Sequence, residues 1–147
     1  MTQPEWAPDF GPSRPHPTAG ATIVGARRAL IAYNVNLATD QIDIAKRVAA
    51  AVRESSGGLP CVKALGMALA DRGIVQVSMN LTNYERTPIQ VAFDRVVAEA
   101  ARDGVAVVDS EIVGLIPAAA LAGTTPAHLR ARGFSVNQIL EHRLTQA

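Results

Sequence analysis

The sequence predicts an α+β fold, a four-stranded antiparallel sheet with two helices on one of its faces. Three observations indicate it. One segment alternates between apolar and polar residues, two apolar-rich runs flank a turn that ends in glycine, and two segments carry apolar residues at three-and-four spacing. The first two patterns are typical of strands and the third of helices. The order strand, helix, strand, strand, helix, strand, joined by right-handed crossovers, gives a ferredoxin-like split β-α-β sandwich.

The first 17 residues predict an arm or linker, because they contain five of the nine prolines. Proline has no amide donor and restricts the backbone, which opposes both helices and central strands. We therefore expect a proline-rich arm over residues 1–19 and the folded domain over residues 20–147. The first strand is predicted over residues 29–37, where the apolar Ile31, Tyr33, Val35 and Leu37 alternate with Ala32, Asn34 and Asn36.

The first helix is expected to begin at a cap, Thr39 or Asp40, and to end near Glu54. Its apolar stripe consists of Ile42, Ala45, Val48, Ala49 and Val52. Two apolar-rich strands follow over residues 62–69 and 74–81, and the short turn between them ends in a glycine that can adopt a positive φ. These two strands are predicted to form a hairpin.

The second helix has a strong predicted start, with Thr87 as the capping residue, Pro88 at the first helical position and Gln90 three residues after the cap. Its predicted apolar stripe consists of Ile89, Phe93, Val96, Val97 and Ala100. An aspartate and a glycine then end the helix, and a fourth strand is expected over residues 105–112.

Two short closing helices are expected over residues 117–122 and 135–144, and Ser135 with Gln138 repeats the spacing of a capping box. In the predicted topology the first and third strands are central neighbours. Their apolar residues are expected to face the helices: Tyr33, Val35, Val75, Val77, Met79 and Leu81.

The other face of the sheet carries neutral hydrogen-bonding side chains from the two central strands: Asn34, Asn36, Gln76, Ser78 and Asn80. Asparagine is depleted in strands, so this composition favours a surface that binds a heterocycle or an amide-bearing ligand. A solvated face that binds nothing is the alternative. Among the charged residues that could frame the surface, Arg27, Arg28 and Lys63 suit carboxylates, and Glu111 suits an amine.

Several classes of function are not expected. The formal net charge of +1 without a block of like charge argues against nucleic acid. No apolar run approaches the roughly 18 residues of a membrane span, and we expect a cytoplasmic protein. The sequence has no HxxxH motif, Cys and His cluster or glycine-rich phosphate loop, so no metal or nucleotide site is predicted. None of His16, His128 and His142 forms a site by spacing, so no catalytic residue is predicted.

Several ordered strings closely resemble the C-terminal subdomain of glutamate formiminotransferase. They are PDFGP at 8–12, GATIVGAR at 20–27, LIAYNVNL at 30–37, VKALGMAL at 62–69, QVSMNLTNYERTPI at 76–89 and SEIVGLIP at 110–117. The resemblance continues more loosely through GFSVNQILEHRL at 133–144. Two departures are that Asp109 stands where the family usually has glycine, and that residues 118–132 are short where the family has a longer helix.

The resemblance implies an enzyme that transfers a formimino group from N-formiminoglutamate to tetrahydrofolate in a cleft between two related halves. In the family, the histidine that transfers protons belongs to the N-terminal half, and PDFGP lies at the junction. The polar face, with Asn34, Asn36, Gln76, Ser78 and Asn80, is then expected to line one wall of the cleft. We expect tetrahydrofolate as co-substrate, no metal, an N-terminal half as partner, and no activity of this chain alone. A non-catalytic folate-binding or regulatory module, which could form a homodimer through the same face, is the alternative.

Overall fold

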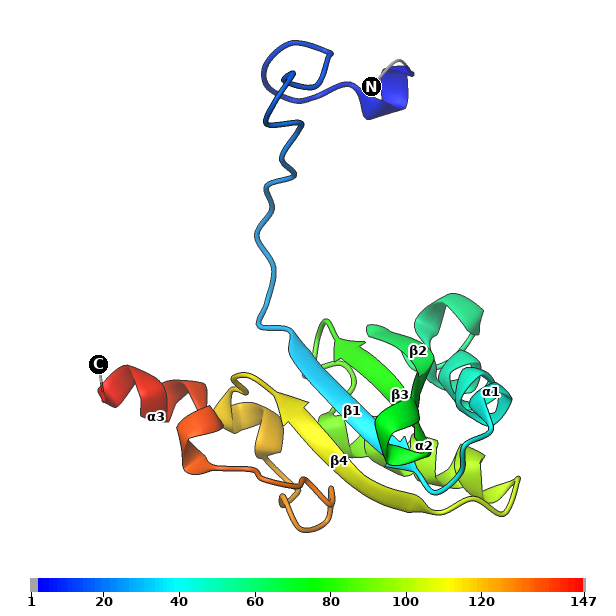
Figure 1. Cartoon of the computed structure of the whole chain (residues 1–147). Coiled ribbons are helices and arrows are strands. Elements are labelled where there is room, and N and C mark those ends of the chain that lie inside the picture. Colours follow the sequence, from blue (N-terminus) through cyan, green and yellow to red (C-terminus); the bar gives the residue numbers. More distant parts are fainter. Residues whose placement is uncertain (1–2, 147) are drawn as a thin grey trace.

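The computed structural model describes residues 3–146 and has the predicted α+β architecture (Figure 1). Its four strands form one antiparallel sheet in the order β2-β3-β1-β4, so the predicted central pair and the ferredoxin-like topology are confirmed. The strands are β1 (Ile31–Leu37), β2 (Val62–Leu69), β3 (Ile74–Leu81) and β4 (Val107–Val113). The helices are α1 (Ile42–Val52), α2 (Ile89–Ala101) and α3 (Leu140–Thr145), and the 3-10 turns are η1 (Pro4–Trp6), η2 (Glu54–Ser56), η3 (Ala70–Arg72), η4 (Ala118–Leu121) and η5 (Val136–Gln138).

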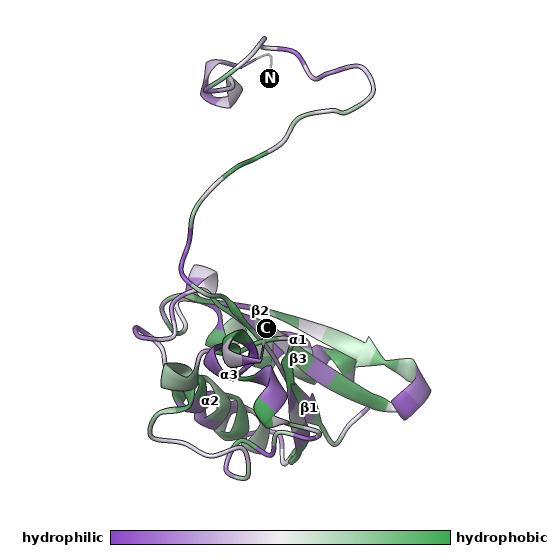
Figure 2. Ribbon diagram, turned by 90° about the vertical axis from the view of Figure 1, so that its left-hand side faces the viewer, coloured by the Kyte–Doolittle hydropathy of each residue, from purple (hydrophilic) through white to green (hydrophobic). Residues whose placement is uncertain are grey.

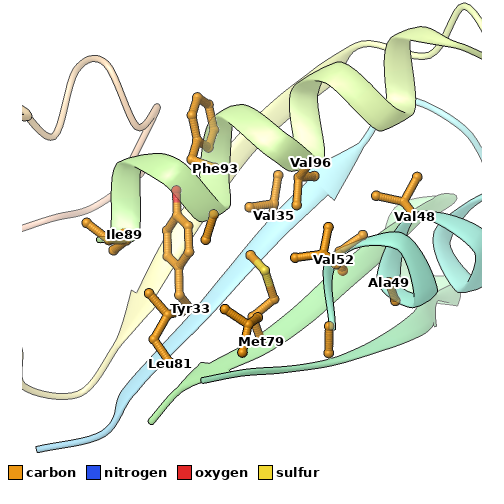
Figure 3. Close-up of a cluster of buried hydrophobic side chains, with 14 of the residues drawn as sticks. Tyr33, Val35, Val48, Ala49, Val52, Met79, Leu81, Ile89, Phe93 and Val96 are labelled. Atoms are coloured by element: carbon orange, nitrogen blue, oxygen red, sulfur yellow. The ribbon is translucent and has the colours of Figure 1, made fainter. Parts of the chain in front are cut away.

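The hydrophobic core lies between the sheet and the two helices α1 and α2 (Figure 3). Alternate residues of the central strands, such as Tyr33, Met79 and Leu81, point from the sheet toward Val52 of α1 and Phe93 of α2, as predicted. All five are at most 4% exposed. Burying one such side chain stabilises a fold by roughly 1.5 to 3 kcal/mol relative to leaving it in water. This packing fixes the alternation of the strands, and with it the residues that project from the opposite face.

The start of α1 differs from the sequence prediction. Its N-cap is Gln41, and neither Thr39 nor Asp40 caps the helix. The Thr39 hydroxyl accepts a hydrogen bond from the Gln41 amide at 3.2 Å, which stabilises the turn before the helix. The helix also ends earlier than predicted, at Val52, because the chain then turns through η2.

The sequence prediction for the start of α2 is also wrong. Pro88 is the N-cap and makes no side-chain capping bond. Thr87 is buried, and its hydroxyl donates to the carbonyl of Pro60 at 2.6 Å, in the turn before β2. Val97, which was predicted in the apolar stripe, is 38% exposed, and the buried residues of α2 include Ala92 and Glu99 instead. A long-range hydrogen bond therefore uses the hydroxyl that local spacing assigned to a cap.

The C-terminal part of the chain is more irregular than predicted. β4 begins and ends later than residues 105–112, and residues 117–122 contain only the 3-10 turn η4. The predicted helix over 135–144 is divided between η5 and α3, because Ile139 between them is extended. The predicted capping box of Ser135 and Gln138 is confirmed. Figure 1 shows this segment beyond β4, at the edge of the sheet.

Residues 3–30 lie outside the sheet and its core. All of them except Pro8 and Leu30 are exposed, and their regular structure is limited to η1 and a bridge between His16 and Gly20. Figures 1 and 2 both show the segment extending from the start of β1 away from the domain. Residues 1 and 2 of the predicted arm, and residue 147 of the predicted domain, lie outside the described residues.

Candidate functional site

The face of the sheet that points away from α1 and α2, here called the open face, presents its side chains in three cross-strand rows. Directly paired residues of neighbouring strands project to the same side, which brings their side chains together. The first row is Lys63, Asn80, Ala32 and Val113; the second is Leu65, Ser78, Asn34 and Glu111; the third is Met67, Gln76, Asn36 and Asp109. All the predicted site residues except Arg27 and Arg28 therefore lie on this face.

The third row is held together by its own hydrogen bonds. Gln76 Nε2 donates to Asn36 Oδ1 at 2.9 Å, and Asn36 Nδ2 donates to Asp109 Oδ1 at 2.5 Å. Asp109 also pairs with Arg72 at 3.2 Å and with Arg132 at 3.6 Å. Asn36 is 2% exposed and Gln76 is 8% exposed, although both were expected on an open surface. Their predicted role in ligand binding stays a prediction, and it depends on the groups that this network leaves over, such as Gln76 Oε1.

The first two rows have polar side chains with no hydrogen-bond partner within residues 3–146. These side chains are Lys63, Asn80, Ser78, Asn34 and Glu111, of which Asn34 and Ser78 are half-buried and the others exposed. The cation lies on the edge strand β2, the carboxylate lies on the edge strand β4, and neutral groups lie between them. This arrangement suits a ligand that carries carboxylates at one end and hydrogen-bonding groups at the other.

A pocket of about 460 Å³ opens at the β2 end of the open face. It combines residues that follow α1 with residues of β2 and β3: Arg53, Glu54, Ser55, Val62, Lys63, Ala64, Leu65, Ser78 and Asn80. Three predicted site residues, Lys63, Ser78 and Asn80, belong to it. Sequence reasoning missed Arg53 and Ser55, because they lie where a helix ends and no spacing in the sequence places that end against the edge of β2.

The turn before β2 lies between Glu54 and Val62, two residues that line this pocket, and it has an unusual backbone. Cys61 has a φ of 60°, a left-handed conformation that costs a non-glycine residue roughly 1 to 3 kcal/mol. Its amide donates to Glu54 Oε2 at 3.0 Å, and its carbonyl accepts from the Thr82 hydroxyl at 3.1 Å. The Pro60 carbonyl is held by Thr87. Side chains from three separate segments therefore fix this turn in place.

Arg27 lies in the exposed segment before β1. Its Nη1 donates to the carbonyl of Arg28 at 3.1 Å, and Arg28 forms an ion pair with Glu85. The structure thus does not bring Arg27 into the rows of the open face, and its predicted contact with a ligand stays a prediction.

Among residues 3–146, two ionisable groups have shifted pKa values, and both stabilise the structure away from the open face. Burial raises the pKa of Tyr33 well above its usual range, so the hydroxyl stays protonated and donates to the Leu129 carbonyl at 3.4 Å. Ser110 donates to the same carbonyl at 2.5 Å. A hydrogen bond from the Ala118 amide lowers the pKa of Glu141. The bonds from Tyr33 and Ser110 attach the segment around Leu129 to the sheet, and the bond to Glu141 joins two segments that follow β4.

The histidines lie away from the open face. His16 accepts backbone hydrogen bonds in the N-terminal segment, and His128 pairs with Asp94 of α2 at 3.1 Å. His142 lies on α3. Within the described part of the chain, no group of three or more His, Cys, Asp or Glu side chains could hold a metal ion. None of the described helices is long and apolar enough to cross a membrane.

Comparison with known proteins identifies a family. Residues 32–143 match the model of the formiminotransferase domain. The chain is 50% identical over 147 residues to a glutamate formimidoyltransferase of Thermoplasma acidophilum, an alignment that covers 100% of this chain and 48% of the relative. It is 47% identical over 145 residues to the glutamate formimidoyltransferase of Streptococcus pyogenes serotype M1, which covers 98% of this chain and 48% of the relative. A formimidoyltransferase-cyclodeaminase of Gallus gallus is 38% identical over 136 residues, 88% of this chain and 25% of the relative. The chain thus spans about half the length of the curated transferases that it matches.

Proposed function

The chain belongs to the formiminotransferase domain family, and we propose that it forms the folate- and substrate-binding half of a glutamate formimidoyltransferase. In this proposal, N-formiminoglutamate gives its formimino group to tetrahydrofolate, and the open face of this chain forms one wall of the cleft where they meet. The observation that carries the proposal is that the open face presents polar side chains with no hydrogen-bond partner among the described residues. The chain that has this face spans about 48% of the length of each of two transferases.

The chemistry of the open face supports binding rather than proton transfer. Its central groups, Asn34, Ser78 and Asn80, are neutral donors and acceptors, which suit the ring edge of a pterin. General acid and base catalysis at the formimino carbon needs a group whose pKa lies near the working pH, and histidine most often provides it. The three rows of the open face contain no histidine. We therefore propose that an N-terminal half supplies the proton-transferring group and that this chain is the C-terminal half. In this proposal, residues 1–19 form an arm before the domain over residues 20–147.

The purified chain is expected to bind tetrahydrofolate weakly and to show no turnover with N-formiminoglutamate. Adding a separately expressed N-terminal half should restore transfer, which the ultraviolet absorbance of the cyclised methenyl product measures. Turnover by the chain alone would contradict the need for a second half. Folate binding without restored activity would favour a non-catalytic module. If no folate binds even in the presence of the second half, the open face is a solvated or dimer surface.

Replacing Asn34 or Asn80 with alanine should weaken tetrahydrofolate binding by about 1 to 3 kcal/mol each, because each substitution leaves a polar group of the ligand unpaired in the cleft. Both side chains project from the sheet away from the core, so the fold should hardly change. Calorimetric titration of the combined halves measures the effect. The matched control is Asn137→Ala, which removes an exposed amide from η5. Unchanged affinity in both site variants would contradict the assignment of the open face as the cleft wall.

A further inference from the structure

The pocket at the β2 end of the open face combines an apolar lining with two cationic side chains. Leu65, which is 64% exposed and stands in the second row beside Ser78, contributes apolar surface, and the largely buried Val62 and Ala64 also border the pocket. Arg53 and Lys63 supply the cations. Ligand pockets commonly have such a composition, an apolar lining with a few polar or charged groups that fix orientation.

Neither cation pairs with a carboxylate among residues 3–146. Arg53 Nε donates to the Ser56 hydroxyl at 2.7 Å, which orients the guanidinium and leaves its two Nη groups for another acceptor. The pocket has one carboxylate of its own, Glu54, whose Oε2 accepts from the Cys61 amide at 3.0 Å. Two cations and one anion leave the pocket with a surplus of one positive charge, so an anionic ligand group is favoured there.

The pocket continues into the second row of the open face. From Leu65 this row passes Ser78 and Asn34 and ends at Glu111 on β4. Neighbouring strands lie about 4.8 Å apart, so the row is about 14 Å long from β2 to β4. A ligand that lies along it meets apolar surface and cations first, then neutral hydrogen-bonding groups, then a carboxylate.

We propose, on the basis of the proposed function, that this pocket binds the p-aminobenzoylglutamate end of tetrahydrofolate. The aromatic ring packs against Leu65, and the glutamate carboxylates pair with Arg53 and Lys63. Arginine binds a carboxylate through two parallel hydrogen bonds, and lysine adds a point charge. The pterin then lies along the second row, with Asn34 and Glu111 facing its polar edge. N-formiminoglutamate carries the same two carboxylates but no ring, and the apolar lining favours the folate end.

The test is a titration of the isotope-labelled full chain with p-aminobenzoylglutamate, followed by nuclear magnetic resonance. Signals of Lys63, Leu65 and Asn80, and the Nε signal of Arg53, should shift. Arg53→Ala and Lys63→Ala should each weaken the affinity at least about tenfold, because each removes one or more charge-assisted hydrogen bonds. The matched controls are Arg143→Ala on α3 and Lys46→Ala on α1, which lie outside the pocket and should leave the affinity unchanged. Well-dispersed spectra of each variant establish that it is folded.

Two further ligands test whether the carboxylates that pair with Arg53 and Lys63 come from the folate tail or from N-formiminoglutamate. A tetrahydropterin without the tail should bind independently of Arg53, and N-formiminoglutamate should bind more weakly than p-aminobenzoylglutamate. The inference is overturned if millimolar p-aminobenzoylglutamate shifts none of these signals, or if N-formiminoglutamate alone depends on both cations. Tetrahydrofolate binding to the combined halves that is unaffected by Arg53→Ala and Lys63→Ala also overturns it, while the proposed function stands. If the combined halves bind no tetrahydrofolate, both fail.

Discussion

Replacing Gly66 with alanine should destabilise the folded chain by about 3 kcal/mol or more. Gly66 lies in β2 where α1 crosses the strand, and a Cβ at this position would lie 2.4 Å from the amide nitrogen of Lys46 and 2.6 Å from the carbonyl carbon of Ala45. Both are backbone atoms, which no change of side-chain rotamer can move. The helix must therefore shift away from the sheet, and overpacking of this kind typically costs about 1 to 3 kcal/mol and sometimes more. Because Ala45 is fully buried, the shift also opens the core.

Urea denaturation followed by circular dichroism measures this loss. The matched control is Gly25→Ala, where a Cβ meets no atom within 4 Å and φ is not left-handed. It should change the free energy of unfolding by less than about 0.5 kcal/mol. A Gly66→Ala protein as stable as the Gly25→Ala control would mean that α1 does not approach β2 this closely. The same displacement should disturb the pocket, because Arg53 and Glu54 directly follow the helix that moves.

The strands were the most predictable part of the fold, since their patterns are local. The hairpin was predicted to the residue, because both apolar runs end at a change of composition around Gly73, whose φ of 62° only glycine adopts easily. The helix starts were predicted less well. Thr87 has the spacing of a cap, but its hydroxyl bonds to Pro60, which lies 27 residues away in the sequence. Local propensity does not encode such a contact.

The candidate site was likewise predictable only where it depends on local sequence patterns. Alternation along β1 and β3 was enough to place Asn34, Ser78 and Asn80 on one face, because the period of a strand is two. The burial of Asn36 depends on Asp109 and on arginines from other segments, which the pattern of β1 does not contain. The pocket depends on Arg53, which reaches the open face only because the chain turns back after α1. The sequence therefore predicted which residues lie on the open face, but not the contacts that those residues make with other segments of the chain.

Replacing Asp109 with alanine should lower the free energy of unfolding by about 2 to 3 kcal/mol. The side chain is 14% exposed and accepts from Asn36 Nδ2, so its removal leaves a buried amide donor without an acceptor. It also leaves Arg72 and Arg132 without their shared counter-ion. The contribution of Arg132 is small, because its side chain is 69% exposed and water screens the pair. Most of the loss is therefore expected from the Asn36 and Arg72 contacts.

The Asp109→Asn variant tests whether Asp109 acts by orienting the amides of Asn36 and Gln76 or through its negative charge. Its amide oxygen can still accept from Asn36 Nδ2, so the row should keep its direction, with Gln76 Nε2 donating to Asn36 Oδ1 and Gln76 Oε1 left over for a ligand. Urea denaturation should give an intermediate stability, and the side-chain amide resonances of Asn36 and Gln76 should stay near their original positions. In Asp109→Ala both resonances should move, whereas the exposed neighbour control Asp71→Ala should leave them unchanged. If Gln76 does not respond to Asp109→Ala, the two amides are not coupled. The other outcome is that Gln76 responds to Asp109→Ala, and that folate affinity falls in Asp109→Ala but not in Asp109→Asn. The carboxylate of Asp109 then acts on the open face by fixing the direction of these hydrogen bonds rather than through its charge.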